Sequence, residues 1–392
     1  MTKQLVPQQD RPFPTMRILL ICTGLKMGGA EQQVVALARQ FLAKGHAVAI
    51  VSLTSGQEVE TPVDATVHSL DMRKGIASFI TALWRLRQFV KRWRPDVMHA
   101  HMIHANLLAR TLASLYRAPP LICSAHSARE GGHFRMLAYR LTDRWASLTT
   151  HVSESGRVAM ITAGAVAPSR IRVMPNGIDT SRFCIDEVAR DKARGALGLG
   201  PETRMVVSVG RLVPEKAQAV LVEAFSRVIA SNTDGDIRLF IVGEGGERAR
   251  LAAQIDRLEL AGSVSLLGLR HDVPSLLAAA DTFVLSSNVE GMPLVIGEAL
   301  ATGCPIVATD AAGVQELLGP CGIVVDCGDV AALAEAIAST CATGRGTGSQ
   351  QRVRRQWVID RFGLESVSQH WIASYRELTL ANQSPVLPEV PR

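Results

Sequence analysis

The feature that most constrains the fold is an alternation of short β-rich runs with helix-length segments, which continues along the whole chain. A strand, a helix and a second strand form the βαβ unit, and repeated units of this kind build parallel sheets. In the first half the predicted strands are Arg17–Thr23, Ala47–Leu53, Val97–Ala100, Leu121–Ala125, Thr149–Val152 and Arg172–Met174. In the second half they are Met205–Gly210, Ile237–Gly243, Val264–Leu267, Thr282–Ser286, Pro305–Ala308 and Gly322–Val325. The pattern predicts an α/β protein with two doubly wound parallel sheets.

The length favours two domains, because 392 residues are enough for two separate cores. A content of 47% hydrophobic and 20% charged residues is that of an ordinary globular protein. Helices are predicted over Glu31–Lys44, Ala217–Ile229, Ala331–Thr340 and Glu365–Leu380. The predicted organisation is a first domain at 16–180, a linker at 181–200, a second domain at 201–360, a final helix at 361–380 and a frayed tail at 381–392.

The sequence gives no sign of export or of a membrane span. The apolar run Ile18–Cys22 is too short for the core of a signal peptide, and no run approaches the roughly 18–20 residues of a transmembrane helix. The seven cysteines include no C-x-x-C pair, so we expect free thiols. We therefore expect a cytoplasmic protein.

Charge is divided unevenly between the halves. Residues 1–180 hold 22 Lys and Arg against 11 Asp and Glu, whereas residues 181–392 hold 20 against 25. One helical stripe is apolar and is predicted to pack on the core (Phe79, Leu83, Leu86, Val90 and Trp93), with arginines and a lysine on the other faces. A second basic stretch covers His133–Arg144. We predict that the first domain rests on anionic lipid headgroups, and that nucleic acid is not a partner because no recognition fold appears.

The unusual residues collect where the predicted strands end, which is where doubly wound sheets bind ligands. They are Gly24–Glu31, His126, Ser153, Pro175–Asp179, Arg211–Lys216, Gly243–Glu247, Gly268–Arg270 and Glu290. Two rims of strand ends predict a ligand held in a cleft between the domains.

Two of these segments suit phosphate groups. Arg211 and Lys216 lie between a strand and a helix predicted to start near Ala217, and cations beside a helix N-terminus form a phosphate site. Gly28 and Gly29 would let backbone approach the same phosphates. The alternatives are solvated loop charges for the basic pair and an ordinary tight turn for the glycines.

Two glutamates stand in the apolar segment VEGMPLVIGEALATGCPIVAT. The helix predicted to start at Pro293 and to end before Gly303 carries Glu298 in its second turn, ~8 Å along the axis from Pro293, which is comparable to the span of a diphosphate. Glu290 and Glu298 could therefore hold hydroxyl groups at the two ends of a sugar–diphosphate–nucleoside. The alternative is a capping Glu290 and a solvated Glu298.

From about residue 16 to 380 the sequence resembles the retaining GT-B glycosyltransferases of family four. The resemblance is carried by KMGGAE at 26–31, the strand end at His126, PNGID at 175–179, GRLVPEK at 210–216, VGEGGER at 242–248, LLGLRHDVPSLLAAAD at 266–281 and E-x7-E at 290–298. It implies two Rossmann-like domains facing a central cleft, with the helix at 361–380 returning to the first domain. Many relatives have glycine after the lysine, where this chain has Ala217.

The resemblance also implies roles for individual residues. The catalytic set would be His126 in the sugar pocket, Arg211 and Lys216 on the donor diphosphate, and Glu290 on the sugar hydroxyls. Glu298 would bind the ribose and the backbone at Leu269 and Arg270 would contact the base. The remaining donor-binding residues would be Gly28, Gly29, Gly243, Gly291, Met292 and Leu294.

The predicted function is transfer of a sugar from a nucleotide diphosphate sugar, with uridine as the expected base, to a saccharide or lipid-linked acceptor during surface polysaccharide synthesis. No cofactor or metal is expected, because the D-x-D at Asp234–Asp236 precedes a strand and is predicted to form a turn. The alternatives are a sugar-nucleotide 2-epimerase of the same architecture and a non-catalytic nucleotide-sugar-binding relative. A dinucleotide oxidoreductase is excluded, because the first turn lacks the glycine fingerprint.

Overall fold

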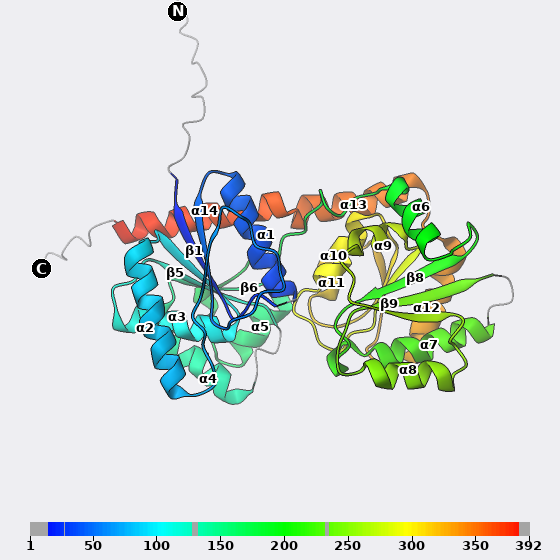
Figure 1. Cartoon of the computed structure of the whole chain (residues 1–392), viewed down its shortest axis with the longest axis horizontal. Helices are drawn as coiled ribbons and strands as arrows, with labels where there is room; N and C mark the ends of the chain where they lie inside the picture. The colour runs from blue at the N-terminus through cyan, green and yellow to red at the C-terminus, as the bar shows by residue number, and fades with distance from the viewer. Residues whose placement is uncertain (1–14, 27, 128–131, 232–234, 384–392) are drawn as a thin grey trace, which may run out of the picture. The chain divides into compact units, whose positions relative to one another are not determined.

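The computed structural model describes residues 15–26, 28–127, 132–231 and 235–383, and these form two parallel sheets (Figure 1). The first sheet has the strand order β3-β2-β1-β4-β5-β6-β7 and the second the order β10-β9-β8-β11-β12-β13. The strands of the first are β1 (Arg17–Cys22), β2 (Ala47–Ser52), β3 (Thr66–Ser69), β4 (Val97–His101), β5 (Leu121–Ala125), β6 (Leu148–His151) and β7 (Ile171–Val173). The strands of the second are β8 (Arg204–Val209), β9 (Ile237–Val242), β10 (Val264–Gly268), β11 (Thr282–Leu285), β12 (Ile306–Thr309) and β13 (Gly322–Val325). The predicted α/β class with two doubly wound parallel sheets is confirmed.

Helices separate the strands, as the sequence pattern predicts. Those of the first half are α1 (Gly29–Ala43), α2 (Ile76–Trp93), α3 (Ile103–Leu115), α4 (His133–Thr142) and α5 (Glu154–Thr162). Those of the second half are α6 (Glu187–Ala196), α7 (Gln218–Ser231), α8 (Arg248–Arg257), α9 (Val273–Ala279), α10 (Leu294–Ala301), α11 (Val314–Leu318), α12 (Val330–Thr343), α13 (Gly348–Phe362) and α14 (Leu364–Gln383).

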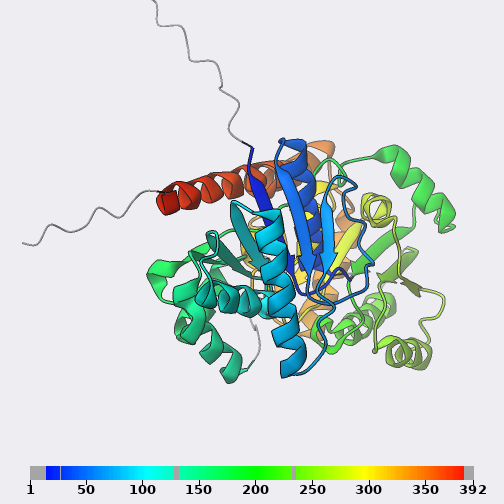
Figure 2. The same ribbon diagram turned by 60° about the vertical axis from the view of Figure 1, so that its left-hand side comes forward.

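Helix α2 packs on the first sheet through the apolar stripe that the sequence predicts. Leu86 is fully buried, and Phe79, Leu83, Val90 and Trp93 pack against the core beneath it. Figure 2 shows α2, in light blue to cyan, running in front of the strands of this sheet. The stripe is therefore a core-packing face, which leaves the basic residues of α2 on its other faces.

The second sheet is covered on both faces. Successive residues of a strand point to opposite faces, and accordingly Val206 packs in one core cluster with α7, α8 and α12, while Val207 packs in another with α9, α10 and α11. Figure 1 shows α7 and α8 on one side of β8 and β9, and α9 and α10 on the other. Strands buried on both faces explain why the sequence reads as continuous apolar runs.

Contacts between residues divide the chain into two compact units. The first comprises 1–123, 144–147 and 373–392, and the second comprises 124–143 and 148–372. The strand ends at His126 and His151 therefore belong to the same unit as the second sheet. Helix α14 starts in the second unit and ends in the first, where Tyr375 contacts Phe41 and its hydroxyl lies 2.7 Å from Nδ1 of His99. The predicted boundaries at 180 and 201 remain a prediction.

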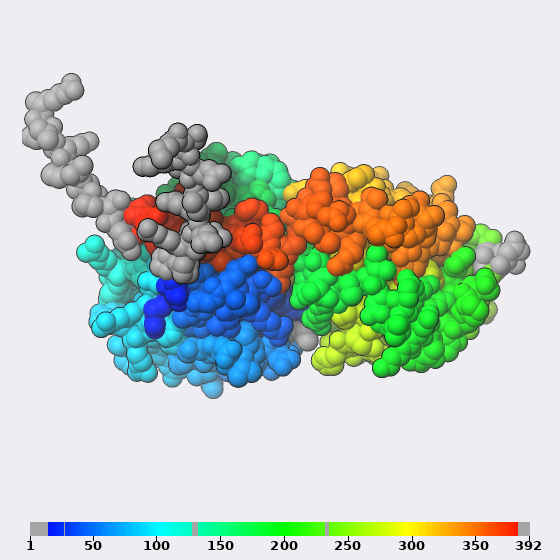
Figure 3. All heavy atoms as spheres, turned by 90° about the horizontal axis from the view of Figure 1, so that it is seen from above, coloured from blue at the N-terminus to red at the C-terminus, as the bar shows by residue number. Residues whose placement is uncertain are grey.

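Two further findings concern the predicted organisation. The predicted linker at 181–200 contains a regular helix, α6, and α13 lies at the surface of the second unit, where it is drawn in orange in Figure 3. Among the described residues, no helix combines the length and the apolar character needed to cross a membrane. Most of the predicted tail, 384–392, and the first 14 residues lie outside the described part of the chain.

Candidate functional site

The candidate site lies at the carboxyl end of the second sheet, between β8 and β11. The chain runs from β8 outward to β9 and β10 on one side, and β11, β12 and β13 lie on the other. The order therefore reverses between β8 and β11, and such a switch point leaves a crevice for ligands. The loops after these two strands are Gly210–Lys216 and Ser286–Glu290.

These two loops are joined by an ion pair and by hydrogen bonds to backbone carbonyl groups. Nζ of Lys216 lies 2.5 Å from Oε1 of Glu290, and the two side chains are only 19% and 9% exposed. The hydroxyl of Ser286 donates to the carbonyl oxygen of Lys216 at 3.0 Å, and the N–H of Asn288 donates to the carbonyl of Glu215 at 2.8 Å. The structure thus brings together two residues that the sequence predicts in one site. Lys216 is paired and partly buried, which excludes a solvated loop charge in this structure.

Arg211 lies at the start of the same loop and its side chain is exposed. Its carbonyl oxygen accepts a hydrogen bond from Nε2 of Gln218 at 2.9 Å, which ties the loop to the first turn of α7. The loop ends in a short 3₁₀ turn at Pro214–Lys216, and Ala217 then adopts a left-handed conformation with φ 48° and ψ 36°. The helix predicted to start near Ala217 begins one residue later, at Gln218, and Ala217 itself occupies a position that favours glycine.

Three glycines let the neighbouring loops approach closely. Gly243 has a φ of 142°, and a Cβ atom there would lie 1.9 Å from the carbonyl oxygen of Gly210. A Cβ atom on Gly291 would lie 2.1 Å from the carbonyl oxygen of His126, and one on Gly313 would lie 2.2 Å from that of Gly291. No larger residue fits without moving backbone. The predicted donor-binding glycines 243 and 291 are therefore required by packing, whatever they bind.

The segment after Glu290 forms the N-terminus of α10. Pro293 precedes the helix as its N-cap residue and Leu294 is its first residue, so the predicted helix start is shifted by one position. Met292 is buried, and its sulfur accepts a hydrogen bond from the N–H of Asn176 at 3.2 Å. The backbone N–H groups in the first turn of a helix have no partner within the helix and favour an anion.

Glu298 lies one turn further along α10 and is partly buried. Burial raises the pKa of its carboxyl group to about 7; Arg182 lowers this pKa and Asp179 raises it. Glu298 is therefore largely protonated below neutral pH. Its role at a ribose remains a prediction.

His126 follows β5 directly and is partly buried. Burial, together with the electrostatic interaction with His151, lowers the pKa of His126 to about 3, so its imidazole is neutral at physiological pH. The next residue, Ser127, accepts a hydrogen bond from Nε2 of His151 at 3.1 Å. A neutral imidazole can exchange hydrogen bonds with a sugar hydroxyl but cannot supply positive charge.

The remaining predicted residues belong to other loops of the chain. Leu269 follows the bend at Gly268 and is exposed, and the guanidinium of Arg270 pairs with both oxygens of Asp272. Gly28 and Gly29 form the N-terminus of α1 in the first unit, so their approach to the donor remains a prediction. Their neighbour Met27 lies outside the described residues, as does Asp234 of the D-x-D. Asp236 precedes β9, at the amino end of the sheet, where it accepts from Thr203 and Arg238.

Sequence reasoning missed two residues beside the site. His151 at the end of β6 is fully buried, and the carboxylate of Glu316 accepts hydrogen bonds from the N–H groups of Glu154 and Ser155 at 2.6 and 2.9 Å. Glu316 thereby caps the N-terminus of α5. A cavity of about 200 Å³ adjoins these groups and is lined by Val152, Ser153, Val173, Pro175, Met292, Gly313, Glu316, Leu317 and Phe362. The sequence predicts Ser153 and Pro175 at strand ends but not beside a cavity.

Two family models match the chain, one in each half of the sequence. A family model described as "Glycosyl transferases group 1" matches residues 203–342, and one described as "Glycosyltransferase Family 4" matches residues 27–182. Together they include the loops after β5, β8, β9, β10 and β11. Both halves of the chain thus match models of one enzyme class.

Among individual proteins, the chain is 30% identical to the Escherichia coli UDP-Gal:alpha-D-GlcNAc-diphosphoundecaprenol alpha-1,3-galactosyltransferase, over 64% of this chain and 66% of that protein. It is 31% identical to a GDP-mannose-dependent alpha-(1-6)-phosphatidylinositol monomannoside mannosyltransferase of Mycobacterium tuberculosis, over 63% and 68%. The crystal structure of Anabaena HepE in complex with UDP and glucose superposes with a TM-score of 0.78 at 25% identity, covering 92% of this chain and 99% of HepE. The matched regions span about two thirds of the two curated relatives and nearly all of HepE.

Proposed function

Since the chain belongs to the group 1, family four glycosyltransferases of GT-B fold, we propose that it transfers a sugar from a uridine diphosphate sugar to a saccharide or lipid-linked saccharide acceptor, with retention of configuration, in cell-surface polysaccharide synthesis. The observation that carries this proposal is the partly buried Lys216–Glu290 pair at the switch point between β8 and β11. The pair places a cation that can bind phosphate beside a carboxylate that can bind hydroxyl groups. A nucleotide sugar carries both phosphate and hydroxyl groups.

The relatives support the choice of donor and acceptor. HepE was crystallised with UDP and glucose, and the name of the E. coli relative specifies a UDP-linked sugar and a diphosphoundecaprenol acceptor. The M. tuberculosis relative is named for GDP-mannose, so the base varies among relatives of similar identity. We assign uridine because the most completely covered of these three relatives, HepE, holds it.

The site residues act on charge in this proposal. An ammonium has three N–H donors, so Lys216 can keep Glu290 and still donate to the diphosphate. Arg211 and the N-terminus of α10 add positive potential where the leaving group gains negative charge. The bond between the anomeric carbon and the phosphate oxygen breaks, a bond to the acceptor oxygen forms, and the acceptor proton passes to the leaving phosphate. Lys216 and Arg211 balance the charge, so no metal is assigned a role.

Neutral His126 and the carboxylate of Glu290 are proposed to hydrogen-bond the donor sugar. His126 contributes hydrogen bonding at the sugar hydroxyls, because burial holds its pKa far below neutrality. Glu290 holds hydroxyl groups as an acceptor. The close approach at Gly291 brings the backbone of the segment Ser286–Gly291, which we call the donor loop, against that of His126. These contacts orient the donor rather than react with it.

The acceptor is proposed to be held at the cytoplasmic face of a membrane. Helix α4 exposes three apolar side chains spaced three and four residues apart, Phe134, Leu137 and Leu141, and the same stretch carries Arg135 and Arg140. An apolar stripe flanked by cations is typical of a helix that lies in the lipid interface. This stripe supports peripheral binding to anionic lipid.

The test is a transfer assay with purified protein, a panel of nucleotide sugars and membrane lipid extract, in which released nucleoside diphosphate and labelled lipid are both measured. Wild-type release should require the extract and should persist with a chelator. Glu290→Ala and Lys216→Ala should each lower kcat/KM about 100-fold or more. Arg238→Ala is the matched control, since it removes an ion pair at the opposite end of the same sheet and should change kcat/KM less than twofold.

Other outcomes would favour the alternatives. Tight nucleotide binding without turnover in any arm would indicate a non-catalytic relative. Epimerised free nucleotide sugar without transfer would indicate the 2-epimerase and would exclude the proposed reaction.

A further inference from the structure

We infer that His151 is a positioning residue for transfer: it fixes the backbone of His126 and Ser127 against the donor loop at Gly291. The inference rests on the proposed function, and it assigns a role to a histidine that stands in none of the segments that carry the family resemblance. His151 is the last residue of β6 and is 0% exposed. Its ring contacts Ser127 beside the site and Gly156 of α5.

The hydrogen bonds of His151 identify its tautomer. Nε2 lies 3.1 Å from the carbonyl oxygen of Ser127, which can only accept, whereas Nδ1 lies within 3.2 Å of both the carbonyl oxygen and the N–H of Ser153. We assign the proton to Nε2, because this tautomer satisfies the Ser127 carbonyl and the Ser153 N–H together. Nδ1 is then the acceptor, and the N–H of Ser153 donates to it at 3.1 Å. Burial lowers the pKa of His151, which keeps this neutral form. The ring therefore bridges the start of α5 and the residue after His126.

The ring is held in one orientation by a close contact with α5. A Cβ atom on Gly156 would lie 1.7 Å from Cε1 of His151 and 2.2 Å from each ring nitrogen. The hydroxyl of Ser153 accepts from the N–H of Gly156 at 3.2 Å, which fixes this turn of the helix. Because the imidazole lies flat on a glycine, it has no room to tilt, and its Nε2–H points at Ser127.

On its other side, the same backbone touches the donor loop. A Cβ atom on Gly291 would lie 2.1 Å from the carbonyl oxygen of His126 and 3.0 Å from the Cα atom of Ser127. Gly291 directly follows Glu290, which pairs with Lys216. A movement of the Ser127 carbonyl therefore shifts His126 and presses on the loop that carries Glu290. Small displacements of this kind, below about 1 Å, can cost on the order of 100-fold in rate.

The neighbouring charges agree with a neutral positioning group. The titratable side chains that act on His151 and its ring are His126 and Glu316. The carboxylate of Glu316 is occupied by the N–H groups of Glu154 and Ser155. His151 therefore neither supplies positive charge to the donor nor pairs with a nearby acid. It acts by directing its Nε2–H bond at the carbonyl oxygen of Ser127.

Two substitutions separate positioning from simple packing. His151→Gln places an amide N–H near Nε2 and keeps a donor for Ser127, whereas His151→Asn places its amide near Nδ1 and loses that donor. The matched control is Thr150→Val, which removes the buried hydrogen bond between Thr150 and Ser124 (2.7 Å) one residue away. Transfer kinetics, UDP binding by calorimetry and thermal unfolding are measured for all three variants.

The expected result is a split between kcat and binding. His151→Asn should lower kcat at least 30-fold, while His151→Gln stays within about fivefold of wild type and Thr150→Val within twofold. The Kd for UDP should change less than threefold in each variant, and all three should lose thermal stability. If His151→Gln and His151→Asn lose kcat equally, or if kcat simply follows the loss of Tm across the three variants, the role is structural and the inference is wrong.

A second measurement does not depend on activity. In protein labelled with ¹⁵N in its histidine rings and its glycines, the ring nitrogens of wild-type His151 should show a proton on Nε2. His151→Asn should shift the His126 ring and Gly291 amide signals, His151→Gln should largely restore them, and Thr150→Val should leave them in place. Unchanged signals in His151→Asn would refute positioning. A wild-type protein that transfers no sugar, with these shifts present, would refute the proposed function alone.

Discussion

At the scale of single residues, the left-handed backbone of Ala217 destabilises the folded protein at the predicted phosphate loop. A residue other than glycine in the left-handed region destabilises the folded state by about 1–2 kcal/mol. Glycine loses more conformational entropy on folding than alanine does, which costs roughly 0.5–1 kcal/mol. Ala217→Gly should therefore raise the free energy of unfolding by about 0.5–1 kcal/mol, measured by urea titration. Ala219→Gly, in the first turn of α7, is the control and should lower it. A destabilised Ala217→Gly would contradict the left-handed conformation.

Glu298 gives a prediction for pH dependence. Its pKa in the folded protein is about 7 against an ordinary value of 4.5, so the folded state binds the extra proton between these pH values. Stability must then fall as pH rises through that window, because the unfolded chain ionises first. Glu298→Gln removes the titration, so its Tm relative to wild type should rise from pH 4.5 to pH 8. A Tm difference that stays constant from pH 4.5 to 8 would show that the carboxyl group is not buried as described.

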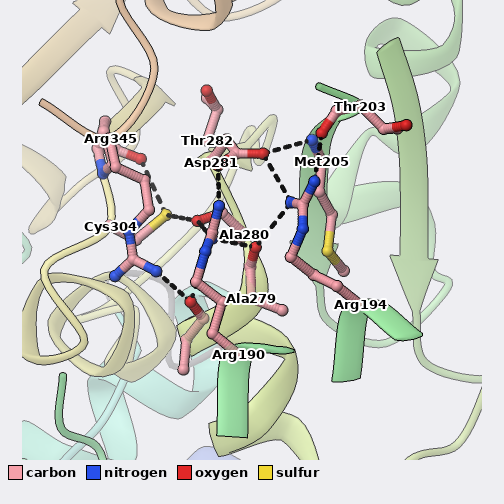
Figure 4. Close-up of polar contacts among 12 residues, drawn as sticks. Arg190, Arg194, Thr203, Met205, Ala279, Ala280, Asp281, Thr282, Cys304 and Arg345 are labelled. Carbon is pink, nitrogen blue, oxygen red and sulfur yellow. Dashed lines mark hydrogen bonds and ion pairs between the residues drawn. The ribbon is translucent and has the colours of Figure 1, made fainter. Parts of the chain in front are cut away.

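At the scale of elements, α6 packs in the second unit through a buried charge cluster. The carboxylate of Asp281 is 3% exposed; it pairs with Arg190 at 2.6 Å and Arg194 at 3.0 Å, and it accepts from the N–H of Met205 at 2.8 Å (Figure 4). Figure 4 also shows the two guanidinium groups reaching backbone oxygens, among them those of Ala279 and Thr203. Removing the carboxylate leaves two cations uncompensated.

Asp281→Ala should therefore lower the free energy of unfolding by about 3–5 kcal/mol, since it breaks a buried ion pair by deleting one partner. The measurement is urea unfolding followed by circular dichroism. Asp191→Asn, on the exposed face of the same helix, is the control and should change stability by no more than about 0.5 kcal/mol. A loss below about 1 kcal/mol for Asp281→Ala would mean that water reaches the arginines.

Several of the strands that the sequence predicts well are buried on both faces. Strands such as β8 and β11 consist of buried residues flanked by loops, and their predicted bounds agree with the structure to within one residue. Strand β3 was missed because it lies at the sheet edge and most of its residues are exposed, and α6 was missed because its surface is strongly polar and glycine-rich flanks suggested a linker. A strand buried on both faces gives a continuous apolar run, which can be recognised in the sequence.

The candidate site divides in the same way. Lys216 and Glu290 are 74 positions apart, yet both follow strands, so a rule about strand ends was sufficient to place them together. His151 and Glu316 act through contacts with backbone groups of Ser127, Glu154 and Ser155, and such contacts leave no spacing or composition signal. Residues that hold other residues in place therefore had to be found in the structure.

At the scale of the whole molecule, the division of charge predicts how the protein meets a membrane. Residues 1–180 carry an excess of 11 positive charges, whereas residues 181–392 carry an excess of 5 negative charges. Each cation near an anionic surface contributes about 1 kcal/mol, and salt screens this attraction over about 10 Å at 0.1 M. Apolar insertion is not screened. The two contributions can therefore be separated by salt.

Vesicles with 30% anionic lipid test this division by co-sedimentation. Replacing Arg135 and Arg140 together by Gln should weaken binding about 30-fold in low salt, equivalent to about 2 kcal/mol, and much less in 0.5 M salt. Replacing Phe134 and Leu141 together by Ser should weaken it in both. The control replaces Arg248 and Arg250 of α8 by Gln, which removes the same charge from the acidic half and should leave binding unchanged. If this control weakened binding as much as the α4 variant, attraction would follow net charge alone, and the first half would have no privileged face for lipid.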